Sequence, residues 1–121
     1  MKKFILILLV IGLFSCQKED NLKPTVNEFP YDVKYTIEVE QYHNETVSLF
    51  YRKHQVLYEI EYIESGVYEI ETTAKKTELL ELGVFGRATH IQFLIYVNGK
   101  EKVNHGFQSF GEEYENVIYE L

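Results

Sequence analysis

From residue 31 onward the sequence alternates between apolar and polar residues, and this period of two limits the fold more than any other feature. In residues 33–40 the odd positions are Val, Tyr, Ile and Val, and the even positions are Lys, Thr, Glu and Glu. Successive side chains of a β-strand point to opposite faces, so this stretch predicts a strand with one buried and one wet face. Similar patterns predict seven more strands, near residues 47–51, 56–62, 68–70, 80–84, 91–97, 103–107 and 117–121.

This series predicts an all-β fold. Seven or eight short strands separated by turns are typical of an antiparallel β-sandwich. Ten Tyr and eight Phe against two Pro agree with a strand-rich chain. Residues 91–97 are apolar on both faces, which predicts a central or covered strand. Near residues 77–82, Leu79 and Leu80 leave a helical turn open as an alternative.

Two turns can be predicted in detail. Glu64-Ser65-Gly66 fits a three-residue hairpin loop with Gly66 in the left-handed conformation. That loop would pair Ile60 with Ile70, which places Ile60 in the core and Glu61 on the outer surface.

Asn98-Gly99 is the strongest local hairpin signal in the chain. A two-residue turn there would pair Val97 with Lys100, whereas the apolar pattern prefers Ile95 opposite Val103, which requires an odd loop or a bulge. Both registers stay open from the sequence.

The first fifteen residues read as a signal peptide. Lys2 and Lys3 are followed by an apolar run from Phe4 to Phe14, which is too short to span a bilayer. The run ends in Leu13-Phe14-Ser15-Cys16, which resembles the bacterial lipobox. The resemblance implies that the Cys16 sulfur receives a diacylglyceryl group, that the leader is removed before Cys16, and that the new amino terminus is acylated. Acyl chains on Cys16 would then anchor the protein to a membrane outside the cytoplasm.

The residues after the cysteine carry a second targeting signal. Gln17, Lys18, Glu19 and Asp20 resemble the lysine-plus-acidic export signal of surface lipoproteins in Bacteroidota. The resemblance implies attachment to the outer membrane with the domain on the cell surface, and a periplasm-facing domain is the alternative. Residues 16–30 form the lipidated cysteine and a flexible tether with two prolines, and residues 31–121 form the β-sandwich domain.

The charge of the chain limits its partners. Removal of Lys2 and Lys3 with the leader takes the net charge from −7 to −9. An acidic chain without a basic cluster in its sequence argues against nucleic acid, and against binding to anionic lipid without the acyl chains. The four histidines lack metal-ligand spacing and Cys16 is the one cysteine, so we expect no metal site, no disulfide and no cofactor.

Three Glu-x-Glu pairs lie on the predicted strands, at residues 38/40, 59/61 and 69/71. In the predicted hairpin, Glu61 faces Glu69 and Glu59 faces Glu71, where like charges oppose each other. Such a face is a candidate site for a cation or a basic partner. We favour the simpler interpretation, a solvated face that keeps the sheet soluble.

Residues 104–114 contain the aromatic side chains most suited to binding. Phe107, Phe110 and Tyr114 lie around Gly106 and Gly111, and a glycine-flanked aromatic loop is a candidate binding loop. The alternative is that these rings fold back over the end of the core.

The sequence favours a non-catalytic, lipid-anchored β-sandwich that binds a protein or a glycan, or has a structural role in the envelope. A hydrolase using paired carboxylates is less favoured, because the carboxylates lie on regular strands and do not converge from loops on a pocket.

A third hypothesis is an accessory or inhibitor subunit that acts on another envelope protein. Residues 33–37 and 91–100 resemble small Ig-like accessory proteins of bacterial envelopes, such as the mycobacterial membrane proteins that accompany large transporters. The resemblance implies an Ig-like fold and assigns no functional residues. The lipobox leader differs from the membrane-spanning anchor of the mycobacterial group.

Overall fold

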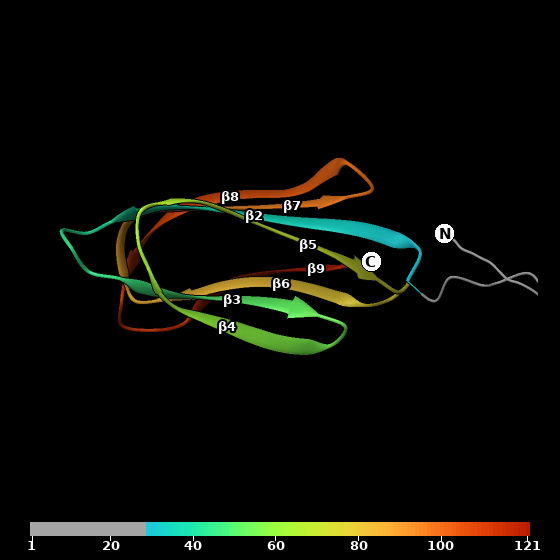
Figure 1. Cartoon of the computed structure of the whole chain (residues 1–121), viewed down its shortest axis with the longest axis horizontal. Coiled ribbons are helices and arrows are strands. Elements are labelled where there is room, and N and C mark those ends of the chain that lie inside the picture. The colour runs from blue at the N-terminus through green and yellow to red at the C-terminus, as the bar shows by residue number, and fades with distance from the viewer. Residues whose placement is uncertain (1–28) are drawn as a thin grey trace, which may run out of the picture.

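The computed structural model describes residues 29–121. The predicted leader, Cys16, the export signal at residues 17–20 and most of the tether lie outside the described residues. The strands, labelled as in Figure 1, are β2 (Tyr31–Gln41), β3 (Val47–Lys53), β4 (Val56–Ile63), β5 (Gly66–Ala74), β6 (Leu79–Phe85), β7 (Arg87–Val97), β8 (Lys100–Phe110) and β9 (Glu115–Glu120).

The eight strands form two antiparallel sheets that pack face to face. The strand order is β5-β2-β7-β8 in one sheet and β4-β3-β6-β9 in the other, and Figure 1 shows the two layers nearly edge-on. The prediction of an all-β antiparallel sandwich is therefore confirmed. β7 lies inside its sheet, as its two apolar faces predicted, and Leu79 and Leu80 belong to a strand, so the helical alternative is wrong.

The core forms from the inward positions of the alternating pattern. Tyr35 and Phe93 are its largest buried side chains, and Leu49, Leu82 and Val84 close it from the other sheet. The buried Tyr35 hydroxyl donates a hydrogen bond to the backbone carbonyl of Arg52 at 2.5 Å, which links the two sheets. Burial raises the pKa of Tyr35 above its ordinary value, so the hydroxyl stays protonated and remains a donor.

The predicted hairpin at residues 64–66 is wrong. β4 pairs with β3, and β5 pairs with β2 in the other sheet, so the chain crosses between sheets here. Tyr35 lies opposite Ile70, and Ile60 lies opposite Leu49 at the open side of the sandwich, where it is 37% exposed and not buried as predicted. Apolar alternation specifies which face of a strand is buried, but it does not specify the neighbouring strand.

The Asn98-Gly99 hairpin combines the predicted two-residue turn with the bulge that the apolar pattern requires, so Ile95 does not pair with Lys102 as the regular register predicts. Asn98 and Gly99 have φ angles of 51° and 79°, as a two-residue type I′ turn requires, and Val97 pairs with Lys100. A register shift between Ile95 and Tyr96 then brings Ile95 opposite Val103. A β-bulge therefore reconciles the turn with the apolar pattern.

The two ends of the sandwich differ in their connections. At the end we call the base, the described chain enters at Phe29 and ends at Leu121, and both hairpins, β3–β4 and β7–β8, turn back there (Figure 1). At the opposite end, which we call the distal end, four connections cross from one sheet to the other: residues 42–46, 64–65, 86 and 111–114.

Candidate functional site

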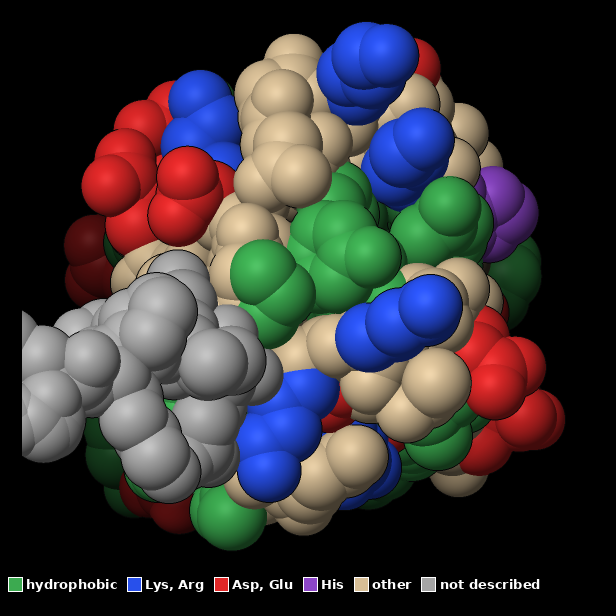
Figure 2. Space-filling view, turned by 90° about the vertical axis from the view of Figure 1, so that its right-hand side faces the viewer, with side chains coloured by type: hydrophobic (Ala, Val, Ile, Leu, Met, Phe, Trp, Pro, Cys, Tyr) green, Lys and Arg blue, Asp and Glu red, His purple; other side chains and the backbone are tan. Residues whose placement is uncertain are grey.

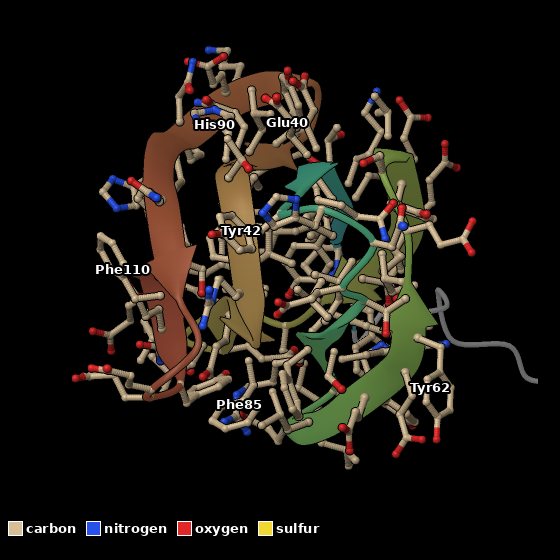
Figure 3. The ribbon with its side chains drawn as sticks, turned by 90° about the vertical axis from the view of Figure 1, so that its left-hand side faces the viewer. Glu40, Tyr42, Tyr62, Phe85, His90 and Phe110 are labelled. Carbon is tan, nitrogen blue, oxygen red and sulfur yellow. The ribbon has the colours of Figure 1, made fainter. Side chains whose placement is uncertain are left out.

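Exposed aromatic side chains mark the distal end, which Figure 3 shows from outside. Tyr62 is 78% exposed and Phe85 is 48% exposed, and Phe110 is exposed as well. Tyr42 lies between them in this view, with the Arg87 guanidinium 4.7 Å from the centre of its ring. Exposed rings of this size are costly in water, and several on one end indicate a binding surface.

Tyr62 and Phe85 border one hollow of about 370 Å³. Val47 and Gly86 also line it, and the remaining lining residues are polar and can donate or accept hydrogen bonds: Thr46, Ser48 and Glu61. Gly86 has a φ angle of 125°, and a Cβ at this position would lie 3.1 Å from the side chain of Val47. A residue other than glycine would therefore strain the turn that borders the hollow.

The backbone turns Tyr62 outward. Tyr62 has a φ angle of 62°, a left-handed conformation that is rare for a large aromatic residue. It lies where the β3–β4 register shifts, between the pairs Val47–Ile63 and Leu49–Ile60. The bulge breaks the alternation there, so that Ile63 stays buried while the neighbouring ring faces solvent. Strained residues of this kind are concentrated at functional sites.

Hydrogen bonds join the crossing loops of the distal end. The backbone amide of Gln41 donates to Ser65 Oγ at 2.8 Å, and the amide of Ser65 donates to Gln41 Oε1 at 3.0 Å. Gln41 Nε2 also donates to the carbonyl of Glu45 at 3.0 Å, within the β2–β3 loop. These contacts hold the end of β2 against the β4–β5 crossing, so Tyr62 projects from a supported surface.

The three aromatic side chains of the predicted binding loop lie in three different places. Phe107 faces the core, with its ring 5.3 Å from that of Phe93. Phe110 is exposed at the distal end and lines a second hollow of about 260 Å³ with Glu112, Glu113 and Glu115. Tyr114 lies over the outer face of the sheet that contains β6, so the three rings do not share one surface.

Tyr114 belongs to a network around Glu81. Tyr114 and Asn116 donate hydrogen bonds to Glu81 Oε2 at 2.7 and 2.9 Å, and Arg52 donates through Nε and Nη2 to Glu81 Oε1 at 3.1 and 2.7 Å. The Glu81 side chain is 6% exposed and that of Arg52 is 25% exposed. A Cβ on Gly83 would overlap the Tyr114 ring, so the close approach of this ring requires glycine.

The network sets the protonation of its members. Burial alone would raise the pKa of Glu81, but the hydrogen bonds from Tyr114, Asn116 and Arg52 outweigh it, and the pKa lies below its ordinary value. Burial and the bond to Glu81 raise the pKa of Tyr114. Four donors therefore surround an ionised carboxylate, and this network fixes the β8–β9 loop on the sheet.

The fold separates the predicted acidic face. Glu59 lies opposite Phe50 on β3, whereas Glu69 and Glu71 lie opposite Thr36 and Lys34 on β2. The predicted oppositions of Glu61 with Glu69 and of Glu59 with Glu71 are therefore wrong, because the two pairs are in different sheets. Among residues 29–121, no three His, Asp or Glu side chains come together as a metal would need.

The base carries charges that the sequence does not show as a cluster. All six lysines of residues 29–121 lie near strand ends or in turns at this end. Figure 2 shows Lys and Arg side chains there around a hydrophobic centre. A hollow of about 360 Å³ here is lined by Tyr31, Tyr119, Leu121 and other residues. Asp32, Glu101 and Glu120 lie at the same end, so the base is mixed in charge. The lysines are scattered in the sequence, and the fold brings them together at the base.

The sequence matches no protein-family model and no curated protein. Among the described residues, no helix is long or apolar enough to cross a membrane.

Proposed function

We propose that this protein is a lipid-anchored, non-catalytic protein of the bacterial cell envelope, which binds a protein or glycan ligand at its distal aromatic surface. Acyl chains on Cys16 hold it in the outer membrane, and residues 17–20 direct the domain to the cell surface. A periplasm-facing domain is the alternative location.

The lipobox-like sequence supports the anchor, and the position of the chain entry supports the binding surface. The described chain enters the domain at the base, next to Tyr31, whereas Tyr62 and Phe85 lie at the opposite end. An anchor on the amino-terminal side leaves the distal end free to meet a ligand. The observation that carries the proposal is the pair of exposed rings of Tyr62 and Phe85 around one polar-lined hollow.

The chemistry of this hollow suits either class of ligand. The apolar faces of Tyr62 and Phe85 can pack against a sugar ring or an apolar side chain. Ser48, Thr46 and Glu61 can bond hydroxyl or amide groups at its rim.

The carboxylate of Glu81, which the network encloses, supports a binding role over a hydrolytic one. Glu81 accepts four hydrogen bonds, and Tyr114 lies across it, so the carboxylate serves the loop and is not free to act on a substrate.

Binding by matched variants tests the proposal. The labelled chain, in detergent, is screened against immobilised envelope glycans and fractionated envelope proteins. We expect the double variant Tyr62→Ala/Phe85→Ala to lose at least about tenfold in affinity for the ligand found. Ile118→Ala removes an exposed apolar side chain on β9 and should leave affinity unchanged. Equal affinity of the double variant and the wild type would contradict a distal binding site.

A second candidate function is that of an accessory or inhibitor subunit of another envelope protein. The exposed edge strand β4 favours it, because it offers a long apolar surface to a partner protein.

A further inference from the structure

The edge strand β4 is exposed along almost its whole length. Among the described residues, five of the ten most exposed large apolar side chains belong to this strand: Val56, Leu57, Tyr58, Ile60 and Tyr62. Ile63, at its distal end, is the buried exception. In Figure 1, β4 runs along the lower margin of the molecule, away from the sheet that contains β2.

Val56, Tyr58 and Ile60 face the inside of the sandwich. Ile60 lies opposite the buried Leu49, and the Tyr58 ring stacks on that of Tyr51, with 5.3 Å between centroids. These side chains remain exposed because they extend beyond β3 at the open side of the sandwich. A further strand next to β4 would cover them and would extend the core.

The backbone of β4 is also open on this side. β4 pairs with β3, and no strand in the described part of the chain pairs with its other edge. Proteins usually protect such edges with Pro, Lys, inward-pointing charges, bulges or short strands. Residues 56–61 contain neither Pro nor Lys and place no charge inward. The bulge of β4 lies beyond these residues' inward positions, next to Tyr62 at the distal end, whereas the edge strand β8 carries Lys100 and Lys102 in addition to a bulge.

Charge selects the kind of strand that can pair there. Glu59 and Glu61 alternate with the inward apolar residues and point to the outer surface. Arg52, which lies opposite Leu57, is engaged by Glu81 and does not neutralise them. We propose that β4 binds an extended segment of a partner protein in which apolar and basic residues alternate, which adds to the sheet as a fifth strand. Its apolar side chains would lie over Tyr58 and Ile60, and its Lys or Arg side chains would lie beside the glutamates.

A second copy of this chain fits the edge less well. Antiparallel pairing of β4 with its own copy keeps inward residues opposite inward residues. Any two-fold register centred from residue 59 to residue 61 then opposes Glu59 or Glu61 to a glutamate of the other copy. Like charges in directly opposite positions destabilise a sheet, whereas a basic partner strand gains from the same positions.

The probe is a synthetic peptide of about nine residues in which valine and lysine alternate, a length that matches an edge strand. Its reference has the same composition with the valines and lysines in two blocks. Binding to the whole chain in detergent is measured by fluorescence anisotropy, and hydrogen exchange reports the β4 amides. We expect the alternating peptide to bind at least about tenfold tighter than the block peptide, to slow exchange in β4, and to weaken as salt rises.

Two variants with the same charge change separate strand addition from simple attraction. Ile60→Lys places a cation on the inward side of the edge and should reduce affinity at least about tenfold. Val67→Lys makes the same change at an exposed position of the edge strand β5 and should change affinity by no more than about twofold. Both positions are exposed, and melting curves of the two variants will test whether each one folds.

Five results would overturn the proposal. Equal binding of the alternating and block peptides, or equal losses in Ile60→Lys and Val67→Lys, would reduce it to non-specific attraction. Equal binding of a peptide that alternates valine with glutamate would remove the charge argument. A dimer of the wild-type chain that Ile60→Lys dissociates would make a second copy the occupant. Tighter peptide binding after deletion of residues 17–28 would make the chain's own amino-terminal segment the occupant. Glu61 and Tyr62 adjoin both surfaces, but the distal proposal is tested with Tyr62→Ala/Phe85→Ala and this one with Ile60→Lys, so either proposal can fail alone.

Discussion

Replacement of Glu81 by Gln should destabilise the fold by an amount that the hydrogen-bond network determines. The least costly orientation turns the new amide nitrogen toward Tyr114, whose hydroxyl can rotate and accept a hydrogen bond. Asn116 then faces a donor and loses its bond, and the two bonds from Arg52 go to a neutral oxygen. Bonds to a charged group are worth about 1.5–3 kcal/mol and neutral ones about 0.5–1.5. Because Arg52 is partly solvated, we expect a loss of about 2–3 kcal/mol.

The measurement is urea unfolding of the purified chain, followed by circular dichroism at several pH values. The folded-state pKa of Glu81 is lowered, so its contribution is present above the ordinary value near 4.5 and is lost as the pH falls through the folded-state pKa. The stability difference between wild type and Glu81→Gln should therefore shrink over that acidic range. Glu69→Gln, on an exposed side chain, should stay within about 0.5 kcal/mol. Equal losses in both variants, or a difference that does not change with pH, would refute this account of the network.

Three further predictions concern the anchor, the location and the core. Cys16→Ala should abolish partitioning into the detergent phase and leave the leader uncleaved; a variant that still partitions would contradict lipidation. Protease added to intact cells should remove the domain, and alanines at residues 18–20 should protect it; full protection of the wild type would indicate a periplasmic domain. Leu82→Ala should lower the free energy of unfolding by about 2–5 kcal/mol, because this side chain is fully buried. Ile60→Ala should cost less than about 1.5 kcal/mol, and equal costs would mean that the core is assigned wrongly.

The sequence predicts the strands well because each strand carries its own alternation. All eight predicted stretches fall within β2 to β9, except that the stretch at the carboxyl terminus extends one residue beyond β9, to Leu121. Partners are harder to predict, because residues 64–66 permit either a hairpin or a crossing between sheets. Contacts with strands that are distant in the sequence decide between the two. β4 pairs with β3 and β5 pairs with β2, so β4 and β5 lie in different sheets.

The candidate sites were also only partly predictable from local sequence patterns. The glycine-flanked loop predicts Phe110 as a binding residue, whereas the alternation in residues 56–62 places Tyr62 on the inward face and Phe85 follows the predicted strand at 80–84 without a signal of its own. The left-handed conformation of Tyr62 has no signal in the residue type. The sequence also gives no signal for the β3–β4 turn, because His54 and Gln55 adopt positive φ angles although neither is Gly or Asn. The Glu81 network joins residues 29 to 35 positions apart, a separation over which local patterns carry no information.

The position of β2 has a mechanical consequence. β2 is the first strand after the chain entry, it starts at the base, and it is paired along its length with β5 on one side and β7 on the other. If a ligand is held at the distal end while the anchor holds the amino-terminal side, the load runs parallel to the strand axes. Both ladders of β2 are then sheared along their whole length, so their hydrogen bonds must fail together and cannot open one after another from an end. A domain attached in this way resists flow and traction better than one pulled apart across its strands.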